Sequence, residues 1–260
     1  MERTNLKGEK EVADTAEKME QLEQEELVGL VVDFFHRTMV HHTLWFKEVE
    51  HQMGMAKALD VLGAVWDKSR ILQMERLSNI FGFDLENGVP KRLAAMPKDK
   101  LLQLLGDLGK NWIANDGIWF QEVESRDSLF DAKRCNDSCW TRFSPFEAWS
   151  IKRFLNLPEH PGLPGLKRAL GFRLYAGINV QTTIEEGPQS LLFQMNNCRV
   201  QAARKKRGLP DYPCKSAGIV EYGTFASQID SRIKTTCVAC PPDDHPPEWF
   251  CAWRFTIDQP

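Results

Sequence analysis

The segment Ile233–Phe255, IKTTCVACPPDDHPPEWFCAWRF, contains three of the seven cysteines of the chain. Its two ends, Ile233–Val238 and Phe250–Ile257, are rich in β-branched and aromatic residues, which favour β-strands. The sequence between them is rich in proline, which lacks the backbone N–H that a strand or helix interior needs. The segment therefore predicts two strands joined by a loop, with Cys237 and Cys240 at the end of the first strand.

A further cysteine precedes this segment at the start of a predicted helix. In a chain without an export signal, spaced cysteines are more often metal ligands or catalytic groups than disulfides, and an odd number argues against a closed disulfide framework. Four thiolates suit structural zinc or an iron–sulfur cluster. The alternative is that the four cysteines are buried independently of one another. In the metal interpretation, Cys198 is a fifth ligand or a free thiol nearby, and His245 could substitute for one cysteine. The predicted metal ligands are Cys214, Cys237, Cys240 and Cys251.

The composition indicates a globular protein with no strong attraction to polyanions. The chain has 260 residues, 42% hydrophobic and 27% charged, with a formal net charge of −3. No apolar run approaches the roughly 18–20 residues that a membrane-spanning helix needs. Residues 1–22 are charged and lack the apolar core of a secretory signal. We therefore expect a cytoplasmic protein that binds neither nucleic acid nor membranes.

The prolines divide the chain into two parts. Eleven of the fourteen lie at or after residue 158, and proline breaks helix interiors. Long helices with apolar residues at three- and four-residue steps are therefore confined to the earlier part. We expect an α+β protein with a charged tail over 1–22, a helical domain over 23–157 and a small α/β domain over 158–260.

The helical part contains an internal repeat. LWFKEVE at Leu44–Glu50 recurs as IWFQEVE at Ile118–Glu124, 74 residues later (118 − 44). Without a gap, a tryptophan further along also stays in register. The repeat predicts two related helical hairpins, 44–83 and 118–157, packed about a pseudo-twofold axis.

The repeat also supplies candidate site residues. Trp45 and Trp119 belong to the hydrophobic core or line a ligand site, and large aromatic residues suit either role. Glu48 and Glu122 are candidate general bases that symmetry could bring together. Glu48 and His51 have the i, i+3 spacing of a di-iron bundle site, although the second copy lacks the histidine; the alternative is that the glutamates are solvated or ion-paired.

A second group of candidates lies in DAKRCNDSCWTR, Asp131–Arg142. On a helix, Cys135 and Cys139 share a face at a four-residue step. One interpretation is a polar pocket in which Arg134 or Arg142 holds an anionic substrate and one of the cysteines reacts. The other is a salt-bridged helix with two buried cysteines, because free cysteine is among the most buried residue types.

The region Phe172–Phe255 resembles the 4-vinyl-reductase domain. The shared pattern is a cysteine that opens a helix with a glycine soon after, here Cys214 and Gly218, and a last cysteine followed by an aromatic residue on the final strand. The resemblance implies a small α/β module with a structural zinc beside a pocket for a small aromatic effector. Cys237 stands where that family often has glutamate, and the loop before the last cysteine is longer, which leaves zinc and iron–sulfur open.

A second resemblance extends over nearly the whole chain. The segments LWFKEVE, KRCNDSCWTRFSPFEAW and LPDYPCKSAGIVEY resemble a group of cytosolic proteins placed near the L-2-amino-thiazoline-4-carboxylate hydrolase-like proteins. This likeness implies, as one alternative, a hydrolase that opens a C–N bond of a small cyclic acid. Its base would be Glu48 or Glu122, Arg134 would hold the substrate carboxylate, and Cys135 or Cys198 would be a nucleophile.

Three functions are therefore expected from the sequence. The first is a metal-binding protein that holds a small aromatic or heterocyclic acid, with Trp45, Trp119 and Arg142 as candidate ligand contacts. The second is the C–N hydrolase, and the third is an iron–sulfur redox protein. The expected partner is a small-molecule ligand or substrate, and the sequence is compatible with a homodimer.

Overall fold

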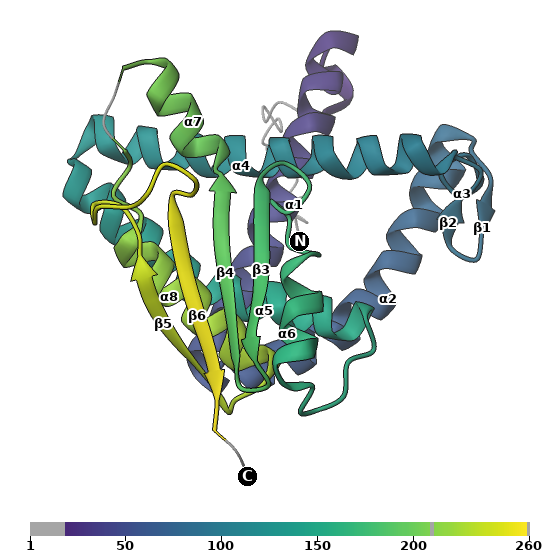
Figure 1. Cartoon of the computed structure of the whole chain (residues 1–260). Coiled ribbons are helices and arrows are strands. Elements are labelled where there is room, and N and C mark those ends of the chain that lie inside the picture. Colours follow the sequence, from purple (N-terminus) through teal and green to yellow (C-terminus); the bar gives the residue numbers. More distant parts are fainter. Residues whose placement is uncertain (1–18, 209–210, 259–260) are drawn as a thin grey trace, which may run out of the picture. The chain divides into compact units, whose positions relative to one another are not determined.

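The computed structural model describes residues 19–208 and 211–258, and these form an α+β fold (Figure 1). The helices are η1 (Met19–Gln21), α1 (Gln24–Met53), α2 (Met55–Phe81), α3 (Lys91–Ala94), α4 (Lys98–Arg126), α5 (Leu129–Phe154), α6 (Gly162–Leu170), α7 (Arg199–Lys206) and α8 (Lys215–Ile229). The strands are β1 (Leu85–Glu86), β2 (Val89–Pro90), β3 (Val180–Gly187), β4 (Ser190–Asn197), β5 (Ile233–Ala239) and β6 (Cys251–Ile257). None of the described helices has the length and apolar character needed to cross a membrane.

The chain forms two compact units, Met1–Leu62 and Gly63–Pro260. The boundary expected at 157/158 lies inside the second unit, where α5 and α8 pack against each other. The first eighteen residues of the expected charged tail 1–22 lie outside the described part of the chain. The second unit thus combines helices from before residue 158 with the sheet that follows it.

The helix bounds repeat with the same offset as the sequence motif. Adding 74 to the bounds of α1 (24–53) gives 98–127, and α4 spans 98–126. The same shift takes α2 (55–81) to 129–155, and α5 spans 129–154. Each pair of long helices is joined by a very short link, which is Gly54 in the first pair, with a φ of +81°. The two hairpins therefore correspond element by element, while their packing about a twofold axis stays a prediction.

The helix α5 runs through a proline. Its N-terminus is capped by Ser128, whose side chain accepts a hydrogen bond from the backbone N–H of Asp131. Pro145 lies inside the helix and is buried, although proline removes one backbone hydrogen bond of the helix. The sequence patterns over Asp131–Arg142 and 144–155 thus belong to one continuous helix.

Four antiparallel strands form the larger sheet in the order β3-β4-β6-β5. The strands expected over 233–238 and 250–257 are confirmed as β5 and β6, with Cys237 opposite Trp253. Along β4, Leu191, Phe193 and Met195 are buried while their neighbours are only partly so. This alternation places one face of the sheet toward α6 and α8, which pack on it.

A close contact between α8 and β6 fixes part of the core. Trp253 is fully buried, with 1% of its surface exposed. A Cβ atom added at Gly218 would lie 2.5 Å from Cζ2 of Trp253. A side chain at this position would clash with the indole ring, so the glycine four residues after Cys214 lets the helix approach the strand.

Candidate functional site

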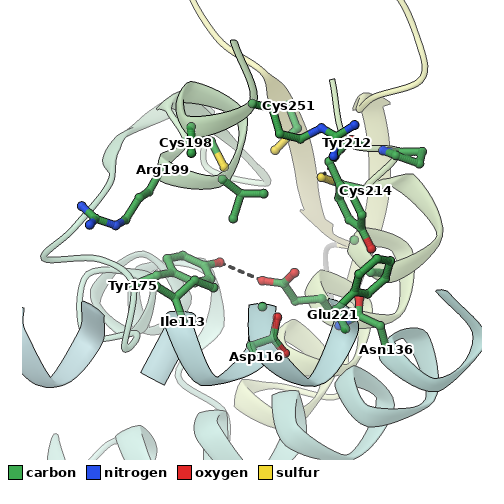
Figure 2. A pocket seen from close by; sticks show the side chains of 18 of the residues that line it. Ile113, Asp116, Asn136, Tyr175, Cys198, Arg199, Tyr212, Cys214, Glu221 and Cys251 are labelled. Carbon is green, nitrogen blue, oxygen red and sulfur yellow. Dashed lines mark hydrogen bonds between the residues drawn. The ribbon is translucent and has the colours of Figure 1, made fainter. Parts of the chain in front are cut away.

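The second unit contains a cavity of about 460 Å³ (Figure 2). Its walls come from α4, α5, α7, α8, from β4 and from the start of β6 at Cys251. Most of the lining is apolar and includes Ile113, Phe120, Trp140 and Met195. A concave, largely apolar pocket with a few polar groups is the usual form of a small-molecule site.

A buried polar network forms part of the cavity wall. Arg173 is buried between two glutamates: its Nε lies 2.9 Å from Oε2 of Glu147, and its Nη1 lies 2.8 Å from Oε1 of Glu221. The hydroxyl of Tyr175 donates to Glu221 over 2.9 Å and lies 3.1 Å from the hydroxyl of Tyr222. Tyr175, Glu221 and Tyr222 line the cavity, so a polar patch with a fixed orientation faces its interior.

Burial governs the protonation of this patch. The pKa of the Glu221 carboxyl is raised because burial penalises its charged form, while the Arg173 guanidinium acts in the opposite direction. Burial likewise raises the pKa of the Tyr175 and Tyr222 hydroxyls well above their ordinary value. Both tyrosines therefore stay protonated at neutral pH and can donate hydrogen bonds.

Four thiols line the same cavity. Cys198 precedes α7, Cys214 precedes α8, Cys240 follows β5 and Cys251 begins β6. Figure 2 shows the sulfur atoms of Cys198, Cys214 and Cys251 at the end of the cavity opposite Asp116. Cys251 lies close enough to Cys240 to raise the pKa of its thiol. The fold thus gathers cysteines that are up to 53 positions apart in the chain (251 − 198).

Cys237 is placed differently from the other predicted ligands. It lies on β5, near Lys215 and Asp243 and near Cys251, but it is outside the cavity lining. Across residues 19–208 and 211–258, no three or more His, Cys, Asp or Glu side chains are arranged so that they could hold one metal ion. The donor chemistry of the cysteines suits a soft metal, and the four-cysteine centre stays a prediction from the sequence.

Three of these thiols, those of Cys198, Cys214 and Cys240, have a raised pKa and are weakly acidic. Burial raises the pKa of Cys198 to about 11. Burial also raises the pKa of Cys214 well above its ordinary value, and nearby Cys198 and Cys251 add to the effect. The neighbouring Cys251 thiol and burial raise the pKa of Cys240. As the structure stands, these cysteines are therefore protonated at neutral pH and are poor nucleophiles.

A second cavity of about 310 Å³ adjoins the first. It contains two of the sequence candidates, Trp119 and Cys135, together with Cys139. Burial raises the pKa of Cys139, and the charge of Asp116 adds to this shift. The two cavities share four lining residues, namely Asp116, Phe120, Asn136 and Trp140.

The remaining sequence candidates in the second unit interact with residues of their own helices. Glu122 pairs with Arg126 at the exposed end of α4. Arg134 lies 2.8 Å from Asp131 on α5, and Arg142 donates to the carbonyl of Ser138 over 3.2 Å. These contacts are exposed i, i+3 and i, i+4 pairs, and neither cavity is lined by Glu122, Arg134 or Arg142.

Two candidates lie in the first unit. Glu48 accepts a hydrogen bond from Gln52 over 2.7 Å on the exposed surface of α1. Trp45 is 62% exposed, so it is not part of a core. The same holds for its counterpart Trp119 in the second unit, which is 69% exposed. The expectation that these tryptophans are core residues is therefore wrong, and ligand contact by Trp45 stays a prediction.

The polar residues of the cavity are not among the candidates predicted from the sequence. Glu221 stands alone among small and apolar residues in KSAGIVEYG, and Asp116 stands in NWIANDGIWF. An isolated carboxylate on an otherwise apolar helix is a signal for a buried acid, since charged residues are rarely buried without a partner. Tyr175 lies in an irregular segment after α6, where no sequence pattern indicates its position.

The fold and the site define an α+β protein with an internal cavity beside a group of thiols. The chain belongs to the Family of unknown function (DUF6125), which matches residues 19–96 and 94–257. No curated protein and no solved structure matches the chain.

Proposed function

We propose that the protein binds a small organic molecule, an aromatic or heterocyclic acid, in the 460 Å³ cavity of its second unit. The observation that carries this proposal is the cavity itself, which combines an apolar lining with a fixed polar patch at Tyr175 and Glu221. Planar rings suit a lining that includes Phe120 and Trp140. The resemblance to the 4-vinyl-reductase domain points to the same class of ligand.

Arginines on α7 and directly after it provide a site for the acid group. Arg199, Arg204 and Arg207 line the cavity. The guanidinium of Arg204 lies 5.9 Å from the ring centre of Tyr212, another lining residue. Guanidinium groups bind carboxylates through paired hydrogen bonds, so a ligand carboxylate is expected at this side of the cavity.

Calorimetric titration tests the proposal with indole-3-acetate and its neutral analogue tryptophol. We expect binding of both, with the acid bound more tightly, and we expect Arg204→Gln to remove most of the advantage of the acid. Arg168→Gln is the matched control, because Arg168 is exposed on α6 and does not line the cavity. Absence of binding by both compounds would reject the proposal.

Metal binding by the cysteines is our second proposal, with zinc as the metal and a [4Fe–4S] cluster as the alternative. It is supported by the positions of Cys198, Cys214 and Cys240 around Cys251. A metal there would be held by Cys214, Cys240 and Cys251, with Cys237 or Cys198 as a further ligand, and it would tie α8 to the sheet. Elemental analysis of protein purified without oxygen tests this proposal directly. About one zinc per chain supports zinc, and brown, iron-loaded protein supports the cluster and a redox function. Metal-free, folded protein rejects both.

Hydrolysis of a cyclic C–N bond is the remaining alternative from the sequence. Cys135 lines the second cavity, which leaves it accessible to a ligand, whereas Glu122 is paired with Arg126. The hydrolase proposal requires Glu122→Gln to abolish turnover of a thiazoline carboxylate without changing the unfolding curve. Unchanged turnover would remove Glu122 from the mechanism.

A further inference from the structure

Asp116 lies at the junction of the two cavities. It is on α4, in the middle of the aromatic segment NWIANDGIWF. It lines both cavities, as do Phe120, Asn136 and Trp140. Figure 2 shows its carboxylate in the cavity on the same side as Glu221. A ligand in either cavity would therefore meet this carboxylate.

The Asp116 carboxyl stands apart from the hydrogen-bond and ion-pair networks of the described residues. Within residues 19–208 and 211–258 it makes neither a hydrogen bond nor a salt bridge. It is also half-buried, and burial raises its pKa. By contrast, Glu221 on α8 is held by Arg173 and Tyr175. A partly desolvated carboxyl without a partner costs free energy, so the fold keeps an acceptor there that a ligand can satisfy.

A second polar group of the same cavity also lacks a partner. The hydroxyl of Tyr212 is buried and, within the described residues, has no hydrogen bond. Tyr212 packs edge-on against Phe120, with 5.2 Å between ring centres. Burial raises the pKa of the Tyr212 hydroxyl, with smaller contributions from Cys214, Asp137 and Asp116. An unpaired acceptor and an unpaired hydroxyl thus lie near each other beside aromatic rings.

These features match a cation carried by an apolar body. A protonated amine has three N–H donors and a full charge that complements a carboxylate. The aromatic rings of Phe120 and Trp140 add attraction for a cation and stacking area for a planar group. A carboxylate or a hydroxyl of a ligand would gain less at this position, because Asp116 repels the first and makes only a neutral-donor hydrogen bond with the second.

We propose that Asp116 is a ligand-binding residue that selects a protonated amine attached to an aromatic ring. The inference rests on the proposed function, because it names the residue that recognises one end of the ligand in the same cavity. Asp116 requires an amine on the ligand, whereas the arginines on α7 and directly after it recognise an acid group. A ligand that carries both groups would satisfy both sides of the cavity.

The test compares tryptamine with tryptophol, which share the indole ring and differ in the amine. By calorimetry at neutral pH, the wild-type protein is expected to bind tryptamine about tenfold more tightly, the effect of one charge-assisted hydrogen bond. Asp116→Asn should reduce this ratio to about one and leave the affinity for tryptophol nearly unchanged. Asp107→Asn is the matched control, because Asp107 is exposed on α4 and pairs with Lys110 away from both cavities.

The two proposals fail in different ways. If tryptophol and indole-3-acetate bind while tryptamine binds no more tightly than tryptophol, the cavity binds ligands but Asp116 does not select an amine. The same conclusion follows if Asp116→Asn keeps the preference for tryptamine. If none of the three indoles binds, the proposed function and this inference are both overturned. The wild-type comparison of tryptamine with tryptophol decides the inference even if the variant does not fold.

Discussion

The Nη1 atom of Arg173 lies 2.8 Å from Oε1 of Glu221, and both residues are buried in the second unit. Arg173 follows α6 and Glu221 lies on α8, so the pair connects two elements of the core. The aromatic rings of Tyr175, Tyr222 and Phe225 surround the guanidinium, with ring centres between 4.3 and 5.4 Å from Cζ. This contact fixes the position of the Glu221 carboxylate, which faces the cavity.

Replacing Arg173 with methionine should strongly destabilise the protein. The substitution removes the positive partner of Glu147 and Glu221 and leaves two buried carboxylates unpaired. Breaking a buried pair in this way costs about 3–5 kcal/mol. Urea unfolding followed by circular dichroism measures the change, with Arg168→Met on the exposed face of α6 as the control. A loss below about 1 kcal/mol would show that the network contributes little to the fold.

Gly218→Ala should destabilise the protein, whereas Gly223→Ala should not. Both glycines lie on α8, but an added Cβ at position 218 meets the Trp253 ring at 2.5 Å and one at position 223 meets nothing within 4 Å. Overpacking of this kind costs about 1–3 kcal/mol, while alanine in place of an uncrowded helical glycine stabilises by up to about 1 kcal/mol. Thermal unfolding of the two variants side by side measures the difference. Equal melting temperatures would contradict the packing of α8 against β6.

Asp230→Asn should destabilise the protein at neutral pH but not in strong acid. Asp230 ends α8, pairs with Arg232 over 2.7 Å and accepts a hydrogen bond from the N–H of Gly162 over 2.9 Å. These contacts, the Arg232 guanidinium first, hold the pKa of the carboxyl well below its usual range.

The pH dependence of that variant follows from the sign of the shift. A carboxyl whose folded pKa is lowered stabilises the protein above its unfolded pKa of about 3.9. This stabilisation is lost as the pH falls from that value through the lower folded pKa. The difference in unfolding free energy between wild type and Asp230→Asn should therefore shrink progressively below about pH 4. A difference that stays constant from pH 7 to pH 2 would show that the charge of Asp230 is not involved.

Alkylation should distinguish the exposed Cys135 from Cys198, which lines the 460 Å³ cavity. Cys135 is exposed on α5, whereas Cys198 is partly buried and its pKa is raised to about 11. Because the thiolate is the reactive form, iodoacetamide at pH 8 should modify Cys135 well before Cys198 in the folded protein. Peptide mass spectrometry over time measures the order, and denatured protein, in which both should react at similar rates, serves as the control. Faster modification of Cys198 in the folded protein would contradict its burial.

Local sequence patterns specify the helices and strands of this protein. The three- and four-residue spacing of apolar side chains indicates the long helices. The repeated W-F-x-E-V-E motif predicts that α1 and α2 correspond to α4 and α5. The β-branched stretches on either side of CPPDDHPPEW indicate β5 and β6. These features depend on residues that are near each other in the chain, so their physical causes can be read from the order of the amino acids alone.

Which distant residues face one another depends on the packing of the helices against the sheet. Arg173 meets Glu147 and Glu221 across 26 and 48 positions, and the cavity brings Asp116 and Cys251 into one lining. Such contacts depend on how helices pack on the sheet, and no local pattern fixes this. The segment Ile233–Phe255 thus specified two strands and their cysteines, while packing placed Cys240 and Cys251 at the cavity and left Cys237 outside its lining.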